Sequence, residues 1–171
     1  IKFTTTTVLN LKNVDRIFIV TNPAFIVLII PIIKIIKKNI KATILVHDVF
    51  PENLQASNIL KSSSLFYKLL NYTFNKCYGK FDNIITIGCD MSEVFKSKIN
   101  LKHHHKIKVI TNWSQTDDIW PGLKKENPII KKLKLENKIV ILFAGNIGRL
   151  QGLKELIPII NQCNDKKFHF L

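Results

Sequence analysis

Residues Ile139–Leu153 read IVILFAGNIGRLQGL, and this stretch decides the fold that the sequence predicts. It opens with an unbroken apolar run, Ile139–Phe143, and ends at Leu153, where apolar residues with helical spacing begin. A short apolar run bounded by glycine is typical of a buried parallel strand, and the later spacing is typical of a helix. The stretch therefore predicts a strand, a turn and a helix, with the turn glycines at Gly145, Gly148 and Gly152.

This turn has the composition of a phosphate-binding loop. Glycines let the backbone approach an anion closely, and the amino end of a helix offers N–H groups and a partial positive charge. Arg149 adds a forked cation. The glycine spacing is G-x-x-G-x-x-x-G, which differs from the dinucleotide-binding pattern. A plain turn without a ligand is the alternative, because glycine is also selected wherever φ is positive.

Strand and helix patterns alternate along the whole chain. The alternation predicts an α/β fold with parallel sheets and right-handed crossovers. Helices are expected over Ala24–Lys38 and Ser62–Tyr78, from a capping box at Asp90 to about Lys98, and over Pro128–Leu133. Strands are expected at Ile17–Val20, Thr43–Val46, Asn83–Ile87, Ile107–Ile110 and Lys167–Leu171.

The helix Ser62–Tyr78 is expected to be amphipathic, with serine at its start and Gly79 at its end. Helical spacing predicts that one of its faces packs against the core. The residues expected on that buried face are Phe66, Leu69, Leu70, Thr73, Phe74 and Cys77.

A polar, turn-rich segment at Ser114–Asn127 predicts a boundary between domains. We expect an N-terminal Rossmann-like domain at residues 1–112, a linker at 113–137, and the start of a second Rossmann-like domain at 138–171. The chain opens on Ile1 and closes in KFHFL, which resembles an interrupted strand. The sequence is therefore expected to be a fragment that is incomplete at both ends.

The formal net charge of +14 invites a nucleic-acid interpretation. Lysine, however, supplies all but two of the 26 basic residues, and lysine, isoleucine and asparagine share A/T-rich codons. The lysine clusters are not interleaved with aromatic residues as in a single-strand binder. We expect no nucleic-acid partner, and attraction to an anionic membrane surface or an anionic substrate stays open.

The most apolar stretch, Ala24–Ile33, is about half the length that spans a bilayer. The segment Ala24–Lys38 is therefore either a buried crossover helix or an interfacial helix with lysines at its end. Three widely spaced cysteines suit a reducing compartment. The expected location is the cytoplasm, with peripheral contact at the inner face of the cell membrane as an open extension.

Candidate chemical residues follow the predicted strands. His47 comes directly after one strand, beside Asp48 and near Glu52, where open α/β sheets bind ligands. It could hold a hydroxyl or carry a proton, or it could serve structure alone. Asn112 and Trp113 follow another strand and could line a cleft. Three consecutive histidines, 103–105, cannot all face one ion in regular structure, so we expect a solvated loop and no metal site.

Taken in order, HDVFPE at His47–Glu52, NW at Asn112–Trp113 and GNIGRLQGL at Gly145–Leu153 resemble the family 4 glycosyltransferases of the GT-B fold. The resemblance is greatest to the branch that builds bacterial cell-surface polysaccharides, such as lipopolysaccharide, capsule or exopolysaccharide. It implies two Rossmann-like domains that bind an acceptor and a nucleotide-sugar donor. It also implies transfer of a hexosyl or other glycosyl group with retention of configuration, without a metal or other cofactor.

The same resemblance implies roles for individual residues. His47 matches the family's cleft histidine, which contacts the donor sugar, and Asp48 and Glu52 match the HDxFPE-type segment. The residues that match the diphosphate loop are Gly145, Asn146, Gly148, Arg149, Gln151 and Gly152. A glycan or lipid-linked molecule is the implied acceptor. A non-catalytic basic α/β binding module at the membrane surface is the alternative.

The chain departs from the family pattern at three places. Asn146 and Gln151 stand where many members carry arginine and lysine for the diphosphate. The family's glycine-rich first loop and its later pair of glutamates have no counterpart in these 171 residues. We therefore expect little or no transferase activity from this stretch alone, because these groups would stabilise most of the leaving diphosphate.

Overall fold

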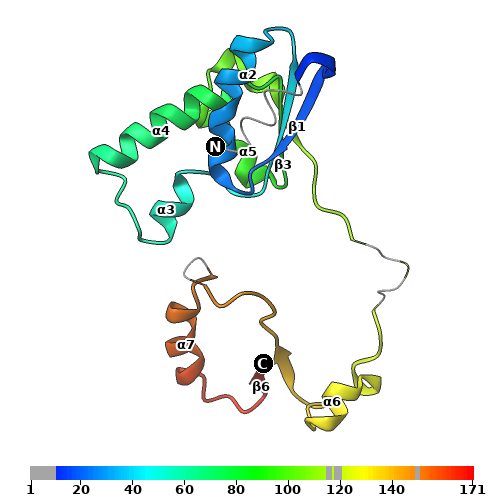
Figure 1. The fold of residues 1–171 in the computed structure, drawn as a ribbon. Coiled ribbons are helices and arrows are strands. Elements are labelled where there is room, and N and C mark those ends of the chain that lie inside the picture. Colours follow the sequence, from blue (N-terminus) through cyan, green and yellow to red (C-terminus); the bar gives the residue numbers. More distant parts are fainter. Residues whose placement is uncertain (1–10, 115–116, 118–120, 149–150) are drawn as a thin grey trace. The chain divides into compact units, whose positions relative to one another are not determined.

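The computed structural model describes residues 11–114, 117, 121–148 and 151–171. It divides the chain into two compact units, unit 1 (Ile1–Asn112) and unit 2 (Trp113–Leu171) (Figure 1). Each unit contains a parallel sheet of its own. The predicted assignment of residues 1–112, 113–137 and 138–171 to an acceptor domain, a linker and a donor domain stays a prediction.

Unit 1 is built on a four-stranded, all-parallel sheet with the strand order β1-β2-β3-β4. Val20 of β1 pairs with Leu45 of β2, and Leu45 pairs with Ile85 of β3. The strands are β1 (Arg16–Val20), β2 (Lys41–Val46), β3 (Asn83–Thr86) and β4 (Ile107–Val109). This sheet confirms the predicted α/β class with a Rossmann-like parallel sheet.

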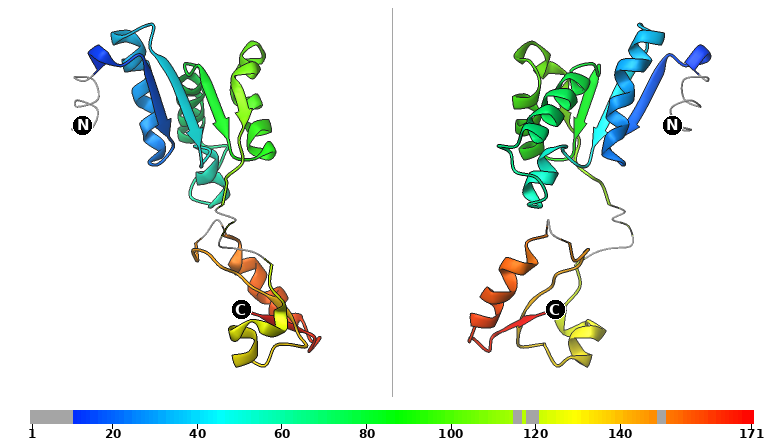
Figure 2. Two further views of the ribbon diagram at one scale, coloured as in Figure 1. Left: turned by 90° about the vertical axis from the view of Figure 1, so that its right-hand side faces the viewer. Right: turned by 60° about the vertical axis from the view of Figure 1, so that its left-hand side comes forward.

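The helices of unit 1 connect successive strands. Figures 1 and 2 show α2, α4 and α5 packed on the sheet, as right-handed crossovers between neighbouring parallel strands require. The α-helices are α2 (Ile30–Ile36), α3 (Glu52–Ala56), α4 (Leu65–Tyr78) and α5 (Cys89–Lys98), and the 3₁₀ turns are η1 (Leu11–Asn13), η2 (Ala24–Ile29) and η3 (Leu101–Lys106).

The hydrophobic core lies in unit 1, between one sheet face and these helices. Alternate residues of β2 (Ala42, Ile44 and Val46) are fully buried, while their neighbours in the strand are more exposed. Aromatic rings extend the core: the Phe50 and Phe74 centroids lie 4.5 Å apart. Parallel strands normally bury apolar residues in this way beneath crossover helices.

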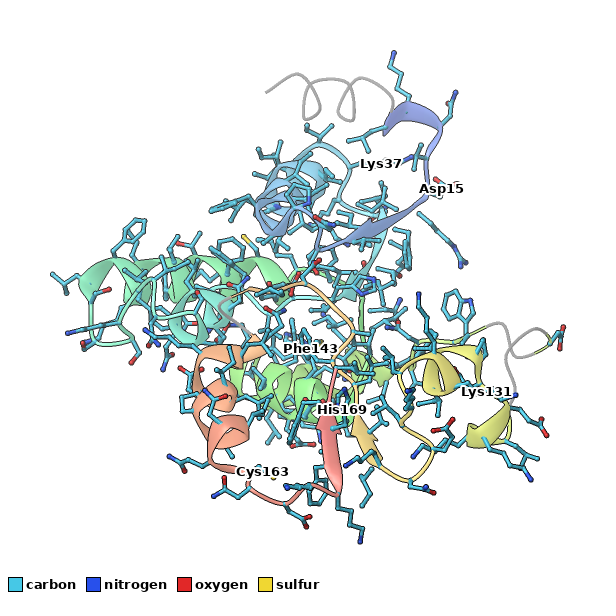
Figure 3. All side chains as sticks on the ribbon, turned by 90° about the horizontal axis from the view of Figure 1, so that it is seen from below. Asp15, Lys37, Lys131, Phe143, Cys163 and His169 are labelled. Atoms are coloured by element: carbon cyan, nitrogen blue, oxygen red, sulfur yellow. The ribbon has the colours of Figure 1, made fainter. Side chains whose placement is uncertain are left out.

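The segment Ala24–Lys38 forms η2 and α2 and ends at Ile36, so the predicted single α-helix begins as 3₁₀ turns. Its inner residues are fully buried, and its lysines contact protein. Lys34 Nζ lies 2.7 Å from Asp82 Oδ2. Lys37 Nζ lies 3.3 Å from Asp15 Oδ1, a pair labelled in Figure 3. These contacts favour the crossover helix over the interfacial alternative.

The predicted start of the helix after β3 is wrong, whereas the predicted end of α4 at Gly79 is right in position but not in backbone conformation. The helix after β3 begins at Cys89 and has Gly88 at its N-cap, so Asp90 lies inside its first turn and is no capping residue. Gly79 ends α4 with φ of −60°, which is right-handed, and its freedom to adopt positive φ is not used there. The amino end of α4 agrees with the pattern, since Ser64 Oγ accepts from the Tyr67 N–H at 3.1 Å.

Unit 2 is a smaller parallel arrangement. Its strands β5 (Ile139–Ile141) and β6 (Phe168–Phe170) pair in parallel and are connected through α7 (Leu153–Gln162). Figure 3 labels His169 on β6 and Phe143 just after β5. The remaining helical segments are η4 (Lys124–Glu126) and α6 (Pro128–Lys132), which Asn127 caps through its side chain. The predicted strand and helix of Ile139–Leu153 are thus present, but the prediction that the strand is buried is wrong, because β5 ends at Ile141 and both Ile139 and Ile141 are exposed.

No helix in the described part of the chain combines the length and apolar character that crossing a bilayer requires.

Candidate functional site

In unit 1 the candidate residues gather at the carboxyl ends of β1 and β2. His47 and Asp48 directly follow β2, and Thr21 directly follows β1. Because the two strands are parallel neighbours, these residues lie at the same edge of the sheet. This edge is where open α/β sheets bind ligands.

Thr21 holds the start of the loop that carries His47. Its hydroxyl oxygen accepts hydrogen bonds from the His47 N–H at 3.0 Å and the Asp48 N–H at 3.2 Å. Thr21 is itself buried, whereas His47 and Asp48 are exposed. The loop therefore presents a histidine and a carboxylate to solvent from a fixed backbone.

Phe50 anchors the middle of this loop in the core. Its ring packs against Phe25 and Phe74, with centroids 5.0 and 4.5 Å away. Its carbonyl accepts a hydrogen bond from the Tyr78 hydroxyl at 3.5 Å. Burial raises the pKa of Tyr78 well above its usual range, so the phenol stays protonated and remains a donor.

Glu52 ends the HDVFPE segment and is held from beneath by a buried lysine. Lys98 Nζ of α5 lies 2.5 Å from Glu52 Oε1 and 3.0 Å from Asn71 Oδ1 of α4. The Lys98 side chain is only 2% exposed, and burial lowers its pKa while Glu52 opposes that shift. Within the described residues, the second oxygen of Glu52 is buried without a hydrogen-bond partner.

This pairing gives Glu52 a structural role in the described chain. Its carboxylate joins α3 to α4 and α5, so it does not stand beside Asp48 as a second free carboxylate. That arrangement argues against the paired-carboxylate chemistry of a glycoside hydrolase, in which both groups act on the substrate. Asp48 and His47 remain the exposed polar groups of the segment.

In unit 2 the candidate loop connects β5 to α7. Gly145, Asn146 and Gly148 are exposed in an irregular segment after the strand. Gly152 adopts φ of +65° at the N-cap of α7, a conformation that strains residues with a side chain. The Gln151 N–H donates a hydrogen bond to the Gly148 carbonyl at 3.3 Å, just before the helix. Arg149 lies outside the described residues.

The other predicted candidates belong to other segments of the chain. Asn112 and Trp113 are exposed after β4, on either side of the division between the units. The histidines 103–105 belong to η3, and a ring nitrogen of His104 lies 2.9 Å from the Lys96 carbonyl oxygen. This tract is therefore a short 3₁₀ segment where we expected an irregular loop.

One comparison with known proteins bears on this arrangement. Over 150 residues the chain is 34% identical to a Pseudomonas aeruginosa protein named "Probable glycosyltransferase WbjE". The chain is a distant homologue of that protein. The match covers 88% of the chain but 37% of the homologue, so the chain spans little more than a third of the length of this curated relative. No family model matches the chain.

Sequence reasoning identified the exposed residues of the loop but missed the residues that hold it. Thr21 could have been noticed, because it follows a strand as His47 does. Lys98 and Asn71 carried no signal, since a lysine and an asparagine on amphipathic helices are expected to face solvent. Glu52, the partner of Lys98, lies 46 residues before it in the chain.

Proposed function

We propose that this chain is part of a glycosyltransferase that moves a sugar from a nucleotide-diphosphate sugar to a glycan or a lipid-linked acceptor. The observation that carries the proposal is its similarity, over most of its length, to a protein named as a probable glycosyltransferase. The motif resemblance and the two parallel α/β units support it. Biosynthesis of cell-surface polysaccharide is the process that we propose for the whole protein.

The proposed chemistry divides between two loops. His47, exposed on a loop whose backbone is held by Thr21, contacts the donor sugar. The loop of Gly145, Asn146, Gly148, Arg149, Gln151 and Gly152 receives the diphosphate at the amino end of α7. As the bond between sugar and diphosphate breaks, negative charge grows on the diphosphate, and oriented N–H groups and Arg149 stabilise it.

The finer proposals follow from the family resemblance. The proposed enzyme belongs to family 4, has the GT-B fold, retains the configuration of the transferred sugar and uses no metal ion. Asp48 and Asn112 are proposed to line the cleft. Glu52 is proposed to support the His47 loop through Lys98.

The test uses the full-length protein and isothermal titration with UDP and GDP, followed by turnover of the matching nucleotide sugars. Arg149→Ala should raise the donor Kd several-fold or more, because a charge-assisted bond to an anion contributes roughly 1.5–3 kcal/mol. His47→Ala should lower kcat with a smaller effect on nucleotide affinity. Lys96→Ala is the matched control, because Lys96 is exposed on α5 and pairs with Glu93. It should change neither the donor Kd nor kcat.

Two outcomes would remove the proposal. Absence of binding to any nucleoside diphosphate would exclude a donor site, and binding without turnover would favour a non-catalytic binding module. An NMR measurement of the anomeric configuration of the product tests retention separately. The 171-residue chain alone should show little or no turnover under the same conditions.

A further inference from the structure

Helix α4 carries large apolar side chains on both of its faces. Its inner face packs into the core through Tyr67, Phe74, Cys77 and Tyr78. Its outer face carries four large apolar side chains that are mostly exposed: Leu65 at 84%, Leu69 at 61%, and Phe66 and Tyr72 at 59% each. Two of these, Phe66 and Leu69, were expected to lie in the core.

The exposed residues form a continuous row along the helix. Leu65, Leu69 and Tyr72 follow one another at spacings of four and three residues, which places them on one side of an α-helix. Phe66 borders this row. Figure 1 shows that the amino-terminal end of α4, where Leu65 lies, is the part of the helix farthest from the sheet.

The outer face of α5 is charged, as the exposed face of an amphipathic helix usually is. Glu93 and Lys96 form an exposed ion pair there, with Nζ and Oε1 2.6 Å apart. A solvated helix face normally carries such charged residues opposite its apolar stripe. A row of exposed large apolar residues is instead typical of a binding surface.

The sequence of α4 and of its flanking segments carries positive charge and no carboxylate, and the nearby Glu52 is paired with Lys98. No aspartate or glutamate occurs from Asn53 to Phe81, and this stretch contains four lysines. Lys68 and Lys76 lie on α4 beside the apolar row and are exposed. Lys76 Nζ lies 4.4 Å from the centre of the Tyr72 ring, so its stem extends along the row.

We propose that α4 docks on an anionic lipid surface, with the helix lying in the plane of the membrane. The docking surface, which we name the outer α4 row, consists of Leu65, Phe66, Leu69 and Tyr72 with Lys68 and Lys76. Its apolar side chains enter the boundary between headgroups and acyl chains, and its lysines reach the lipid phosphates. The lack of carboxylates on α4 itself matters, because a negative charge within the row would repel the same phosphates.

This inference is independent of the proposed transferase reaction. It places the membrane contact on α4, whereas Ala24–Lys38 buries its inner face and engages Lys34 and Lys37 in contacts within unit 1. Failure of lipid docking would leave the donor site untouched, and failure of donor binding would leave the docking surface untouched.

The experiment is flotation of the 171-residue chain with two kinds of vesicle. One is pure phosphatidylcholine, and the other contains equal parts of phosphatidylcholine and phosphatidylglycerol. We expect binding to the anionic vesicles, weakened at about 1 M salt, where the Debye length falls to about 3 Å. Leu65→Ser with Leu69→Ser should lower the partition coefficient about tenfold or more, because two exposed leucines lose their burial in lipid.

Leu101→Ser is the matched control, because Leu101 is 78% exposed but lies on η3. It should leave flotation unchanged. Lys68→Gln with Lys76→Gln should weaken binding to the anionic vesicles only, and Lys96→Gln should not. Amine-reactive footprinting of the unsubstituted chain supplies a second measurement: on vesicles, Lys68 and Lys76 should lose reactivity while Lys102 keeps it.

Three results would overturn the proposal. One is equal flotation of the Leu65→Ser/Leu69→Ser and Leu101→Ser variants. Another is unchanged reactivity of Lys68 and Lys76 on vesicles that hold the chain. The third is self-association that Leu65→Ser/Leu69→Ser abolishes while vesicle binding is absent, which would assign the outer α4 row to a second copy of the chain.

Discussion

Unit 1 and unit 2 both join parallel strands through helices, yet they bury very different amounts of apolar surface. Unit 1 contains a continuous cluster of buried residues that runs from Leu11 to Ile99. Of the described hydrophobic residues of unit 2, Leu135 alone is buried. Burial of apolar area supplies most of the favourable free energy of folding, so the two units should differ widely in stability.

This comparison shows that a recognisable sequence motif need not lie in the well-packed part of the chain. The stretch from which the fold was predicted, Ile139–Leu153, lies in the less buried unit, and Ile141, Leu142 and Phe143 are exposed there. The His47 loop lies in the well-packed unit, where Thr21, Phe50 and Lys98 hold it. The His47 loop is therefore held by buried residues, whereas the strand that precedes the glycine loop is poorly buried.

Hydrogen exchange should show the largest difference between the two units. Amides of β2 and β3 should exchange about a thousandfold more slowly, relative to random coil, than amides of β5. The reason is that core strands open only at a cost near the global stability, while poorly buried elements open almost freely. Mass spectrometry of the peptides that cover Lys41–Val46 and Ile139–Ile141 measures this, and equal protection of the two would contradict the comparison.

Phe74→Ala should destabilise unit 1 by about 3–5 kcal/mol, because the ring is fully buried and its loss leaves a cavity. The matched change in unit 2, Phe143→Ala, should cost about 1 kcal/mol or less, because 40% of that side chain is already exposed. Urea unfolding followed by near-ultraviolet circular dichroism of tyrosine reports on unit 1, because all three tyrosines lie there, and hydrogen exchange of the peptide that covers Ile139–Ile141 reports on unit 2. Similar costs at the two positions would mean that unit 2 also has a packed core.

Lys98→Met should destabilise unit 1 by about 3 kcal/mol at neutral pH, because it leaves the half-buried Glu52 carboxylate without its partner. Lys96→Met, which breaks only the exposed pair with Glu93, should change stability by about 0.5 kcal/mol or less. The double variant Lys98→Met/Glu52→Gln should recover part of the loss. No recovery would indicate that packing of the lysine stem, rather than its charge, supports the segment.

Thr21→Val should cost about 1–3 kcal/mol, since it removes the acceptor for the His47 and Asp48 N–H groups. Thr21→Ser keeps the hydroxyl and should restore protection of these two amides, which NMR-detected hydrogen exchange can measure. If the valine variant protects both amides as the parent chain does, Thr21 does not hold the loop.

The smallest expected effect is on pH dependence. Burial lowers the pKa of Lys98 below its usual value of about 10.5. Between the lowered pKa and that value the unfolded chain binds more protons, so the unfolding free energy of unit 1 should rise with pH through this window. Raised tyrosine pKa values act in the opposite direction above about pH 10. Comparison of the parent chain with Lys98→Met isolates the contribution of the lysine. Identical slopes of unfolding free energy against pH in the two proteins would contradict the attribution to Lys98.

Particular elements show how far sequence reasoning reached. The strands β1 to β4 and the helix after Gly152 fall close to their predicted positions, because hydrophobic periodicity is a local property of the chain. The start of α5 was mistaken, because the pattern Asp90-Met-Ser-Glu93 matched a capping box while Gly88 occupies the N-cap. Phe66 and Leu69 were assigned to the core, because their residue types alone do not tell which apolar face of α4 meets the sheet.

Part of the candidate site was predictable, because the ends of strands can be located from local sequence patterns. His47 and Asp48 follow a strand and are exposed, as their position suggested. The part they take in donor binding, like that of the Gly145–Gly152 loop, stays a prediction. The role of Lys98 was not predictable, because a contact between residues 46 apart depends on how α3, α4 and α5 pack together.

By itself the sequence determined the α/β class, the parallel strands and the order of strand, glycine turn and helix, since binary patterns specify elements and their alternation specifies topology. The tertiary structure alone decided which side chains of α4 remain outside, which lysine lies beneath Glu52, and which unit holds the core. Those outcomes depend on the docking of helices against a sheet, where side chains distant in sequence compete for the same buried volume.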